Sequence, residues 1–355
     1  MIKCVIANVS SIEIDHSQNL AIPYNAPMRT GLVYNDQFLE HDTGPGHPER
    51  PDRLCAIIDK LKQQHIYEQL IPIPFDPINI DQVHRLHDPA YTQRLHEACQ
   101  SGLRFIDSDD SSISSRSYDI ALLAAGGVLA AVDAIMAGNI AQAFCAIRPP
   151  GHHAEYAQSM GFCFFNNIAL AADYLTDRYG LDRVAIVDFD VHHGNGTQHL
   201  LENRSDILVI NIHQHPSTLY PGTGFAYEEG KEQGTGFTLN LPLQPGAEFT
   251  DYRQIFIHKI VPKLNEFKPQ FLLLSAGFDA SKDDPLASMN LAPSDFSWIT
   301  NTLKQIAARH ADHRLLSVLE GGYDLRSLAE CAAAHVQSLL DDPEDNTIMK
   351  MKAGF

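Results

Sequence analysis

The stretch Val184-Ala-Ile-Val-Asp-Phe-Asp-Val-His-His-Gly-Asn-Gly196 joins a short apolar run to a dense set of acids and histidines. A near-continuous apolar run of this length is typical of a buried strand in a parallel sheet. Acidic and imidazole side chains directly after such a strand lie at its carboxyl end, where open parallel sheets bind their ligands. The stretch therefore predicts an α/β fold with a functional site at one edge of its sheet.

Further apolar runs along the chain also resemble buried strands, and segments with helical periodicity separate them. This alternation predicts a single-domain, three-layer α/β/α fold with a mostly parallel sheet. The serine-rich segment Ser111–Ser117 is expected to be a loop. The expected strands are Phe144–Ile147, Val184–Val187, Ile207–Ile212, Phe271–Leu274 and Leu315–Leu319, and the expected helices are Asp119–Ala137, Asn167–Tyr179, Asp251–Phe267, Pro293–His310 and Leu325–Leu340.

Composition and charge narrow the class of protein. With 355 residues, 44% of them hydrophobic, the chain can bury a substantial core. The net charge of -18 argues against direct nucleic-acid binding and is compatible with cationic substrates. Six cysteines without a Cys-x-x-Cys pair favour free thiols in a reducing compartment. No run reaches the length of a membrane span, and residues 1–30 lack signal-peptide features, so we expect a cytoplasmic protein without a membrane partner.

A candidate metal site comes from two neighbouring motifs. Asp190 and His192 are two residues apart and face the same way if the chain is still extended there. Asp279, in Gly277-Phe-Asp279, supplies a second carboxylate. Such a set can form a three-ligand catalytic Zn²⁺ site with an open position for water and substrate, and Fe²⁺ or Co²⁺ can occupy it because sulfur ligands are absent. The alternative is a buried charge pair that caps loops.

Two further motifs carry groups suited to amide hydrolysis. His152 and His153 follow Pro149-Pro-Gly151, which rules out a helix and presents both rings on a rigid loop. Imidazole can act as both base and acid near neutral pH. Tyr323 follows Glu320-Gly-Gly322, whose glycines let a ring approach the metal, and a phenol can donate to an oxyanion. In isolation each of these residues is more often structural, but the metal motif reverses that expectation.

Taken together with Gly46-His-Pro-Glu-Arg-Pro-Asp-Arg53, these motifs resemble those of the histone deacetylase and acetylpolyamine amidohydrolase superfamily, and the pattern is closest to the class II type. The resemblance implies an arginase/deacetylase-like fold with an N-terminal extension (1–30), a deacetylase-like catalytic domain (31–341) and a C-terminal tail (342–355). It also implies a zinc-dependent amidohydrolase that removes acetyl groups from acetylated amines by means of metal-activated water and releases acetate. The substrates would be acetyl-lysine in proteins or peptides, or acetylpolyamines.

The resemblance assigns a role to each residue of the expected active site. His153 is the general base and acid, and His152 is chiefly its electrostatic partner. A side chain behind each ring orients it. The remaining assignments are Asp188 behind His152, Asn195 behind His153, Tyr323 at the oxyanion, and Asp190, His192 and Asp279 as metal ligands.

The resemblance further implies a narrow tunnel whose flat apolar walls fit a linear methylene chain. Phe162 forms one wall, and Tyr220 forms the other where the family commonly has phenylalanine. The Gly161 carbonyl accepts the substrate amide N–H. At the rim, Asp110 holds the substrate backbone or amine. Leu286 occupies a position where polyamine deacetylases of one branch carry glutamate, which removes one argument for polyamine specificity.

Other charged residues near the motifs carry expectations of their own. Arg53 matches the arginine that lines the family's internal acetate cavity, since a buried guanidinium attracts the carboxylate product. Glu49 and Arg50 are expected to form a structural ion pair. Asp188, Asp190 and the backbone near His192 resemble the family's monovalent-cation site, with Asn211 where serine is common, which makes K⁺ a candidate second ion.

Three other classes of protein compete with this interpretation. A di-manganese ureohydrolase on the related arginase-like fold needs further bridging aspartates and histidines that the motifs do not supply. A catalytically silent binder of acetylated ligands would ordinarily lack a metal ligand or the tyrosine. A structural zinc protein usually has four ligands rich in cysteine. An active enzyme is favoured, while its preferred acylated substrate and its assembly as a monomer or homo-oligomer stay open.

Overall fold

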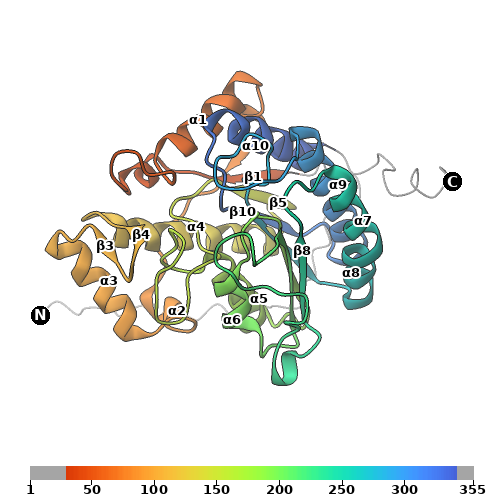
Figure 1. Cartoon of the computed structure of the whole chain (residues 1–355), viewed down its shortest axis with the longest axis horizontal. Coiled ribbons are helices and arrows are strands. Elements are labelled where there is room, and N and C mark those ends of the chain that lie inside the picture. Colours follow the sequence, from red (N-terminus) through yellow and green to blue (C-terminus); the bar gives the residue numbers. More distant parts are fainter. Residues whose placement is uncertain (1–28, 342–355) are drawn as a thin grey trace, which may run out of the picture.

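The computed structural model describes residues 29–341, which build an eight-stranded parallel sheet with helices on both faces (Figure 1). The expected N-terminal extension, apart from its last two residues, and the expected C-terminal tail lie outside the described residues. In the view of Figure 1, α1 (Asp52–Gln63) and α10 (Leu325–Leu340) lie above β1, whereas α4 (Ser117–Met136) and α5 (Asn167–Tyr179) lie below it. The expected three-layer α/β fold is confirmed.

The strands are short and mostly buried, as expected for a parallel sheet covered on both faces. Their spatial order is β2-β1-β5-β10-β9-β6-β7-β8, and a separate antiparallel pair, β3-β4, lies outside this sheet. The bounds in the main sheet are β1 Thr30–Val33, β2 Ile71–Pro72, β5 Gln142–Cys145, β6 Val184–Asp188, β7 Ile207–Gln214, β8 Thr238–Leu243, β9 Phe271–Ala276 and β10 Leu315–Leu319, and those of the pair are β3 Phe105–Ile106 and β4 Ser108–Ser112.

The helices agree with the sequence pattern where their ends carry strong signals. The expected bounds of α5, α9 and α10 match the observed ones residue for residue. The remaining helices include short ones that the pattern did not indicate. Besides α1, α4, α5 and α10, the α-helices are α2 Ile80–Val83, α3 Pro89–Ser101, α6 Asn195–Leu201, α7 Phe249–Ile255, α8 Val261–Phe267 and α9 Pro293–His310, with 3₁₀ turns at Asp36–Glu40, Tyr67–Gln69 and Glu232–Gly234.

Two local expectations are wrong. The single helix expected over Asp251–Phe267 is interrupted by a π-helical turn, Phe256–Ile260. Pro262, which follows this turn, has no N–H to donate to the preceding turn, so the regular hydrogen-bond pattern cannot continue through it. The expected loop at Ser111–Ser117 is also only partly a loop, because Ser111 and Ser112 end β4 and Ser117 begins α4.

Helix α4 contradicts the expectation that no run reaches the length of a membrane span. By length and composition alone it is long and apolar enough to cross a membrane, but 67% of its most apolar window is buried inside the protein. It packs against α5 and β5. Beneath these helices the core includes four buried free cysteines (Cys99, Cys145, Cys163 and Cys331), and the half-buried Cys55 is also a free thiol, as the cysteine pattern predicts.

Candidate active site

The topology places four chemical motifs at one edge of the sheet. β5, β10, β9 and β6 are adjacent parallel strands, so the segments that follow them open at the same carboxyl edge. The tandem histidines follow β5, the tyrosine motif follows β10, Asp279 follows β9, and Asp190 with His192 follows β6. Motifs more than 170 residues apart in the sequence are thereby brought together, as the sequence predicts.

Asp190, His192 and Asp279 form a compact buried cluster. Their candidate ligand atoms all lie within 4.8 Å of one another. His192 Nδ1 is 3.1 Å from Asp190 Oδ1 and 3.1 Å from Asp279 Oδ2. Two carboxylates buried side by side repel each other, and a cation between them relieves that repulsion. The donor set, two oxygens and one nitrogen, suits a divalent metal ion.

Backbone groups hold these carboxylates in place. Val191 N donates to Asp279 Oδ1 over 2.9 Å, and Gly321 N donates to Asp190 Oδ2 over 2.7 Å. A Cβ atom on Gly321 would lie 2.1 Å from Asp279 Oδ2, and one on Gly277 would lie 2.0 Å from Asp190 Oδ2. Only glycine therefore leaves space for the carboxylates at these two positions, and the residues present fit a bound metal ion.

The tandem histidines lie beside the metal cluster, each with a partner behind it. His152 Nδ1 is 2.9 Å from Asp188 Oδ2, and His153 Nδ1 is 2.6 Å from Asn195 Oδ1. The two ring centroids are 4.0 Å apart. The structure thus places both histidines and both orienting side chains in the arrangement that the resemblance implies.

The two imidazoles lie in different electrostatic environments. Burial lowers the pKa of His152, but the carboxylates of Asp190, Asp188 and Glu320 outweigh this effect and raise it to about 10. Burial, followed by the charge of His152, lowers the pKa of His153 well below its ordinary value. His153 is therefore the ring with a free lone pair near neutral pH, as a general base requires.

Tyr323 lies against Phe162 and Arg53. Its ring meets that of Phe162 edge-on at 5.8 Å, and the Arg53 guanidinium lies 5.1 Å from its centroid. Burial, followed by the carboxylates of Asp279 and Asp190, holds the pKa of the Tyr323 hydroxyl well above 10. The phenol therefore keeps its proton near neutral pH and can act as a hydrogen-bond donor.

The expected tunnel residues flank these groups. Tyr220, 39% exposed, meets the His153 ring edge-on at 5.2 Å. Gly161 adopts a left-handed conformation with φ +53°, and a Cβ atom there would lie 2.2 Å from His153 Cδ2. The Phe162 ring meets that of Tyr323, whereas the Tyr220 ring meets that of His153, so the two aromatic side chains lie against different catalytic candidates.

At the rim, the carboxylate of Asp110 on β4 accepts hydrogen bonds from Ser108 and Ser111. Burial, followed by the charge of Asp110, raises the pKa of the Tyr220 hydroxyl. Leu286 is half-buried, and its N–H donates to Asp284 Oδ1 over 3.0 Å.

Arg53 is fully buried and already holds the backbone near Tyr323. Its Nε and Nη2 donate to the carbonyls of Gly322 and Glu320, each over 2.6 Å, and its Nη1 donates to Glu49 over 3.1 Å. The expected ion pair between Glu49 and Arg50 is wrong. Glu49 lies on the buried side and pairs with Arg53 and Arg148, whereas Arg50 faces solvent and lies 3.3 Å from Asp52.

The sequence motifs did not assign roles to three carboxylates that the structure places behind the site. Glu320 Oε2 accepts the N–H groups of Gly151 and His152, so it holds the histidine loop. Asp284 Oδ2 accepts a hydrogen bond from Tyr323 N over 2.7 Å. Glu155 contacts Asn195. Only Glu320 carried a signal, because it directly follows an apolar strand.

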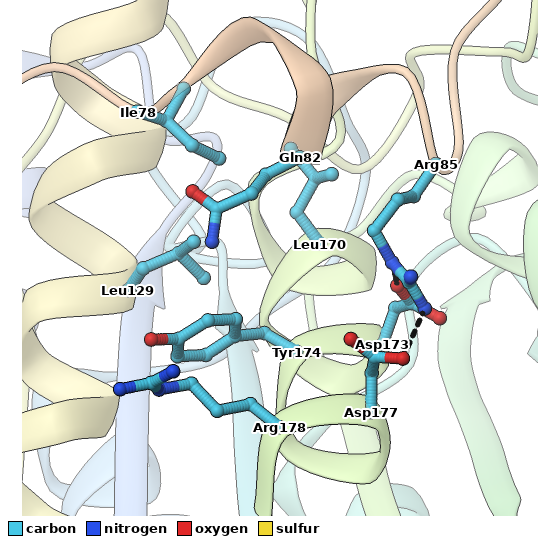
Figure 2. Close-up of a pocket in the computed structure, with 9 residues that line it drawn as sticks. All are labelled: Ile78, Gln82, Arg85, Leu129, Leu170, Asp173, Tyr174, Asp177 and Arg178. Atoms are coloured by element: carbon cyan, nitrogen blue, oxygen red, sulfur yellow. Dashed lines mark hydrogen bonds and ion pairs between the residues drawn. The ribbon is translucent and has the colours of Figure 1, made fainter.

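The pocket drawn in Figure 2 lies elsewhere, among α2, α4 and α5, and its volume is about 260 Å³. Arg85 pairs there with Asp173 at 2.5 Å and with Asp177 at 3.1 Å. None of the candidate site residues lines it, and these charged side chains satisfy one another. We therefore assign it no role. Its lining is Ile78, Gln82, Arg85, Leu129, Leu170, Asp173, Tyr174, Asp177 and Arg178.

A parallel sheet with a metal-type cluster, an oriented histidine pair and a tyrosine at its carboxyl edge defines a metal-dependent hydrolase. Comparison with known proteins agrees. The family model of the histone deacetylase domain matches residues 47–339. The chain is 39% identical to a probable deacetylase of Archaeoglobus fulgidus over 300 residues, covering 84% of this chain and 82% of that one. It is 36% identical over 329 residues to the human polyamine deacetylase HDAC10, covering 89% of this chain and 49% of the relative.

Among solved structures, the HD domain of HDA15 is similar, with a TM-score of 0.84, 34% sequence identity, and coverage of 88% of this chain and 90% of that one. This chain belongs to the histone deacetylase family. The predicted fold and the predicted hydrolytic removal of acetyl groups from acetylated amines are confirmed. The family is metal-dependent, which agrees with the cluster of Asp190, His192 and Asp279.

Proposed function

We propose that the chain is a zinc-dependent deacetylase of acetylated amines carried on a linear methylene chain, with acetyl-lysine in proteins or peptides as the first candidate substrate. The observation that carries the proposal is the convergence of Asp190, His192 and Asp279 beside the oriented pair of His152 and His153. Zn²⁺ is our choice of metal because catalytic zinc sites typically take three ligands from the protein and keep an open position for water or substrate, and Fe²⁺ or Co²⁺ could substitute for it.

The proposed mechanism divides the reaction among the residues of the site. The bound metal would supply Lewis acidity toward water and the acetamide carbonyl. His153 takes a proton from the attacking water and gives one to the departing amine, while His152 and Asp188 provide charge beside it. Tyr323 donates its hydroxyl proton in a hydrogen bond to the substrate oxyanion. The products are acetate and a free amine.

We propose that Phe162 and Tyr220 flank the methylene chain and that the Gly161 carbonyl accepts the substrate amide N–H. Asp110, held by two serine hydroxyls at the rim, favours a cationic or N–H-bearing substrate. That carboxylate supports acetylpolyamines as a second candidate substrate, and the human relative is named a polyamine deacetylase. Leu286 supports the peptide, because it offers no charge to a polyamine.

We also propose two roles for polar groups deeper in the protein. Asn211 Oδ1 is buried without a hydrogen-bond partner among residues 29–341, and Asp188 Oδ2 lies near the same space, since both would contact a Cβ atom on Gly194. Carbonyl and carboxylate oxygens of this kind suit a K⁺ ion. Arg53, buried behind Tyr323, would attract the acetate product.

The test compares turnover of the zinc-loaded protein on acetyl-lysine peptides and on N-acetylated polyamines, with Tyr323→Phe as the inactive control. Faster turnover of the peptides, lost in the variant, would support an acyl-lysine deacetylase. Faster turnover of the polyamines would instead support the second candidate and point to the acidic rim as its cause. Turnover of neither substrate by protein that retains its metal would contradict the proposal.

A further inference from the structure

Glu155 lies on the loop that follows the tandem histidines, and its carboxylate joins this loop to helix α6. Its Oε1 accepts a hydrogen bond from Asn195 Nδ2 over 2.5 Å and lies 2.8 Å from His199 Nδ1. Asn195 and His199 are one turn apart on α6. The carboxylate therefore meets α6 at the residue that contacts His153, and the Glu155 side chain is only 21% exposed.

The chemistry of a carboxamide makes this contact consequential. An asparagine side chain offers one accepting oxygen and one donating nitrogen, and it can present either of them to a neighbouring ring. An ionised carboxylate only accepts. Because Glu155 takes the Nδ2 donor of Asn195, the oxygen Oδ1 must face His153, where it lies 2.6 Å from Nδ1.

The orientation of the amide fixes the protonation of the ring. An oxygen at 2.6 Å from His153 Nδ1 requires that nitrogen to carry a proton, which leaves the lone pair on Nε2. Asn195 Nδ2 is also 3.3 Å from the carbonyl of His153, which agrees with the same orientation. The flipped amide would instead present a donor to Nδ1 and favour the tautomer whose Nε2 is already protonated.

We propose that Glu155 is a positioning residue that orients the Asn195 amide and thereby keeps His153 in the tautomer able to accept a proton at Nε2. This inference rests on the proposed function, in which His153 transfers the protons. The backbone of Glu155 is anchored independently of its side chain, because its N–H donates to Gln158 O over 3.0 Å and its carbonyl lies 2.9 Å from His87 Nδ1. Changes to the side chain therefore leave the loop held.

The first experiment is steady-state kinetics of Glu155→Ala on an acetyl-lysine peptide. We expect kcat to fall about tenfold or more with little change in KM, since residues behind a catalytic histidine typically have effects of this size. The matched control is Glu202→Ala, which removes a carboxylate that pairs with Lys231 at 2.6 Å near the end of α6. The control should keep the kcat of the unmodified enzyme.

A double-mutant cycle separates orientation from general damage. Aspartate at position 195 presents an acceptor to His153 in every orientation, so it has no need of Glu155. We expect Glu155→Ala to lower kcat in the Asn195 enzyme but not in the Asn195→Asp enzyme. An equal loss in both backgrounds would overturn the inference.

A readout without turnover is the Nδ1–H signal of His153 in the NMR spectrum of histidine-¹⁵N-labelled protein, assigned by its loss in His153→Ala. We expect a single Nδ1-protonated state in the unmodified protein and a mixture of tautomers in Glu155→Ala. An unchanged signal together with unchanged kcat would refute the role of Glu155. If the unmodified protein hydrolyses no acetylated amine, the proposed function fails, while this spectrum still tests the positioning of His153.

Discussion

The Tyr323 hydroxyl is the smallest group on which the proposed chemistry depends. Its ring is fixed between Phe162 and Arg53, so replacement by phenylalanine removes one oxygen and keeps the packing. We expect Tyr323→Phe to lower kcat about a hundredfold or more, because a preorganised donor to the oxyanion is lost. Steady-state kinetics with the preferred acetylated substrate checks the value.

Tyr252 provides the control for this change. It is fully buried, and its hydroxyl has no hydrogen-bond partner among the described residues. Tyr252→Phe should keep full activity and should not lower the melting temperature, because it removes an unsatisfied polar group. Equal activity of the Tyr323→Phe variant and the Tyr252→Phe variant would exclude the oxyanion role.

A second prediction concerns a single ligand residue of the metal cluster. Asp279→Asn removes a charge from the ligand set, so the variant should retain far less Zn²⁺ after dialysis than the unmodified protein, as measured by elemental analysis. Added Zn²⁺ should raise the melting temperature of the unmodified protein, since a ligand of the folded state stabilises it by about 2.7 kcal/mol at a hundredfold excess over Kd. Added Zn²⁺ should raise the melting temperature of the Asp279→Asn variant much less.

The exposed Asp109 serves as the control carboxylate, and Asp109→Asn should bind metal normally.

Residues in contiguous motifs, such as Asp190 and His192, could be assigned from the sequence because their spacing and chemistry are visible there. The partners behind them could not. Glu49 meets Arg148 across 99 residues, and nothing local in either segment distinguishes that pair from the expected pairing with Arg50.

At the level of the elements, the residues that follow the strands leave no space for a larger side chain beside the metal-site carboxylates. Gly321→Ala after β10 would put a methyl group 2.1 Å from Asp279 Oδ2 and 2.5 Å from Asp190 Oδ2. We expect the variant to lose metal binding and activity together, because one of the two carboxylates must move. Elemental analysis and turnover of the purified variant provide the measurement.

Gly102→Ala is the control for the backbone effect. Gly102 ends α3 at φ +77° and has no atom within 4 Å of the position a Cβ would take. Alanine there should cost about 1 kcal/mol of stability through backbone strain and leave metal binding intact. Loss of metal from this variant as well would show that general destabilisation accounts for the Gly321→Ala result.

How well an element could be predicted depended on its end signals and its polarity. Asn166 caps α5 and Gly180 ends it, while Asp324 caps α10, so their bounds follow from the sequence. The edge strand β8, Thr238–Leu243, was not predicted because it is only partly buried and contains Pro242. The antiparallel β3-β4 pair was missed because its strands are short and polar.

For the molecule as a whole, buried neutral histidines predict the response to acid. Burial lowers the pKa of His335 to about 3 and that of His87 to about 4, from 6.5. Between pH 6.5 and these lowered pKa values, the unfolded chain therefore binds more protons than the folded one. The stability that the neutral histidines contribute is present above pH 6.5 and is lost as the pH falls from 6.5 toward 4. Burial also lowers the pKa values of His41 and His213.

Chemical denaturation at pH 7 and pH 5 measures this effect. His335 lies between Thr300 Oγ1 at 2.6 Å and Ser317 Oγ at 2.8 Å, two contacts that glutamine can partly replace. We expect His335→Gln to reduce the difference in free energy of unfolding between the two pH values by about 2 kcal/mol. A difference equal to that of the unmodified protein would contradict this prediction.

The central position of β10 has a consequence for how the chain is made. β10 lies between β5 and β9, yet among the strands within residues 29–341 it is synthesised last. While the chain grows on the ribosome, the edges of β5 and β9 emerge without the neighbour that joins them, and such edges invite wrong pairing. We expect nascent chains stalled before Leu315 to be readily digested by protease, and resistance to appear only once β10 and α10 have left the exit tunnel.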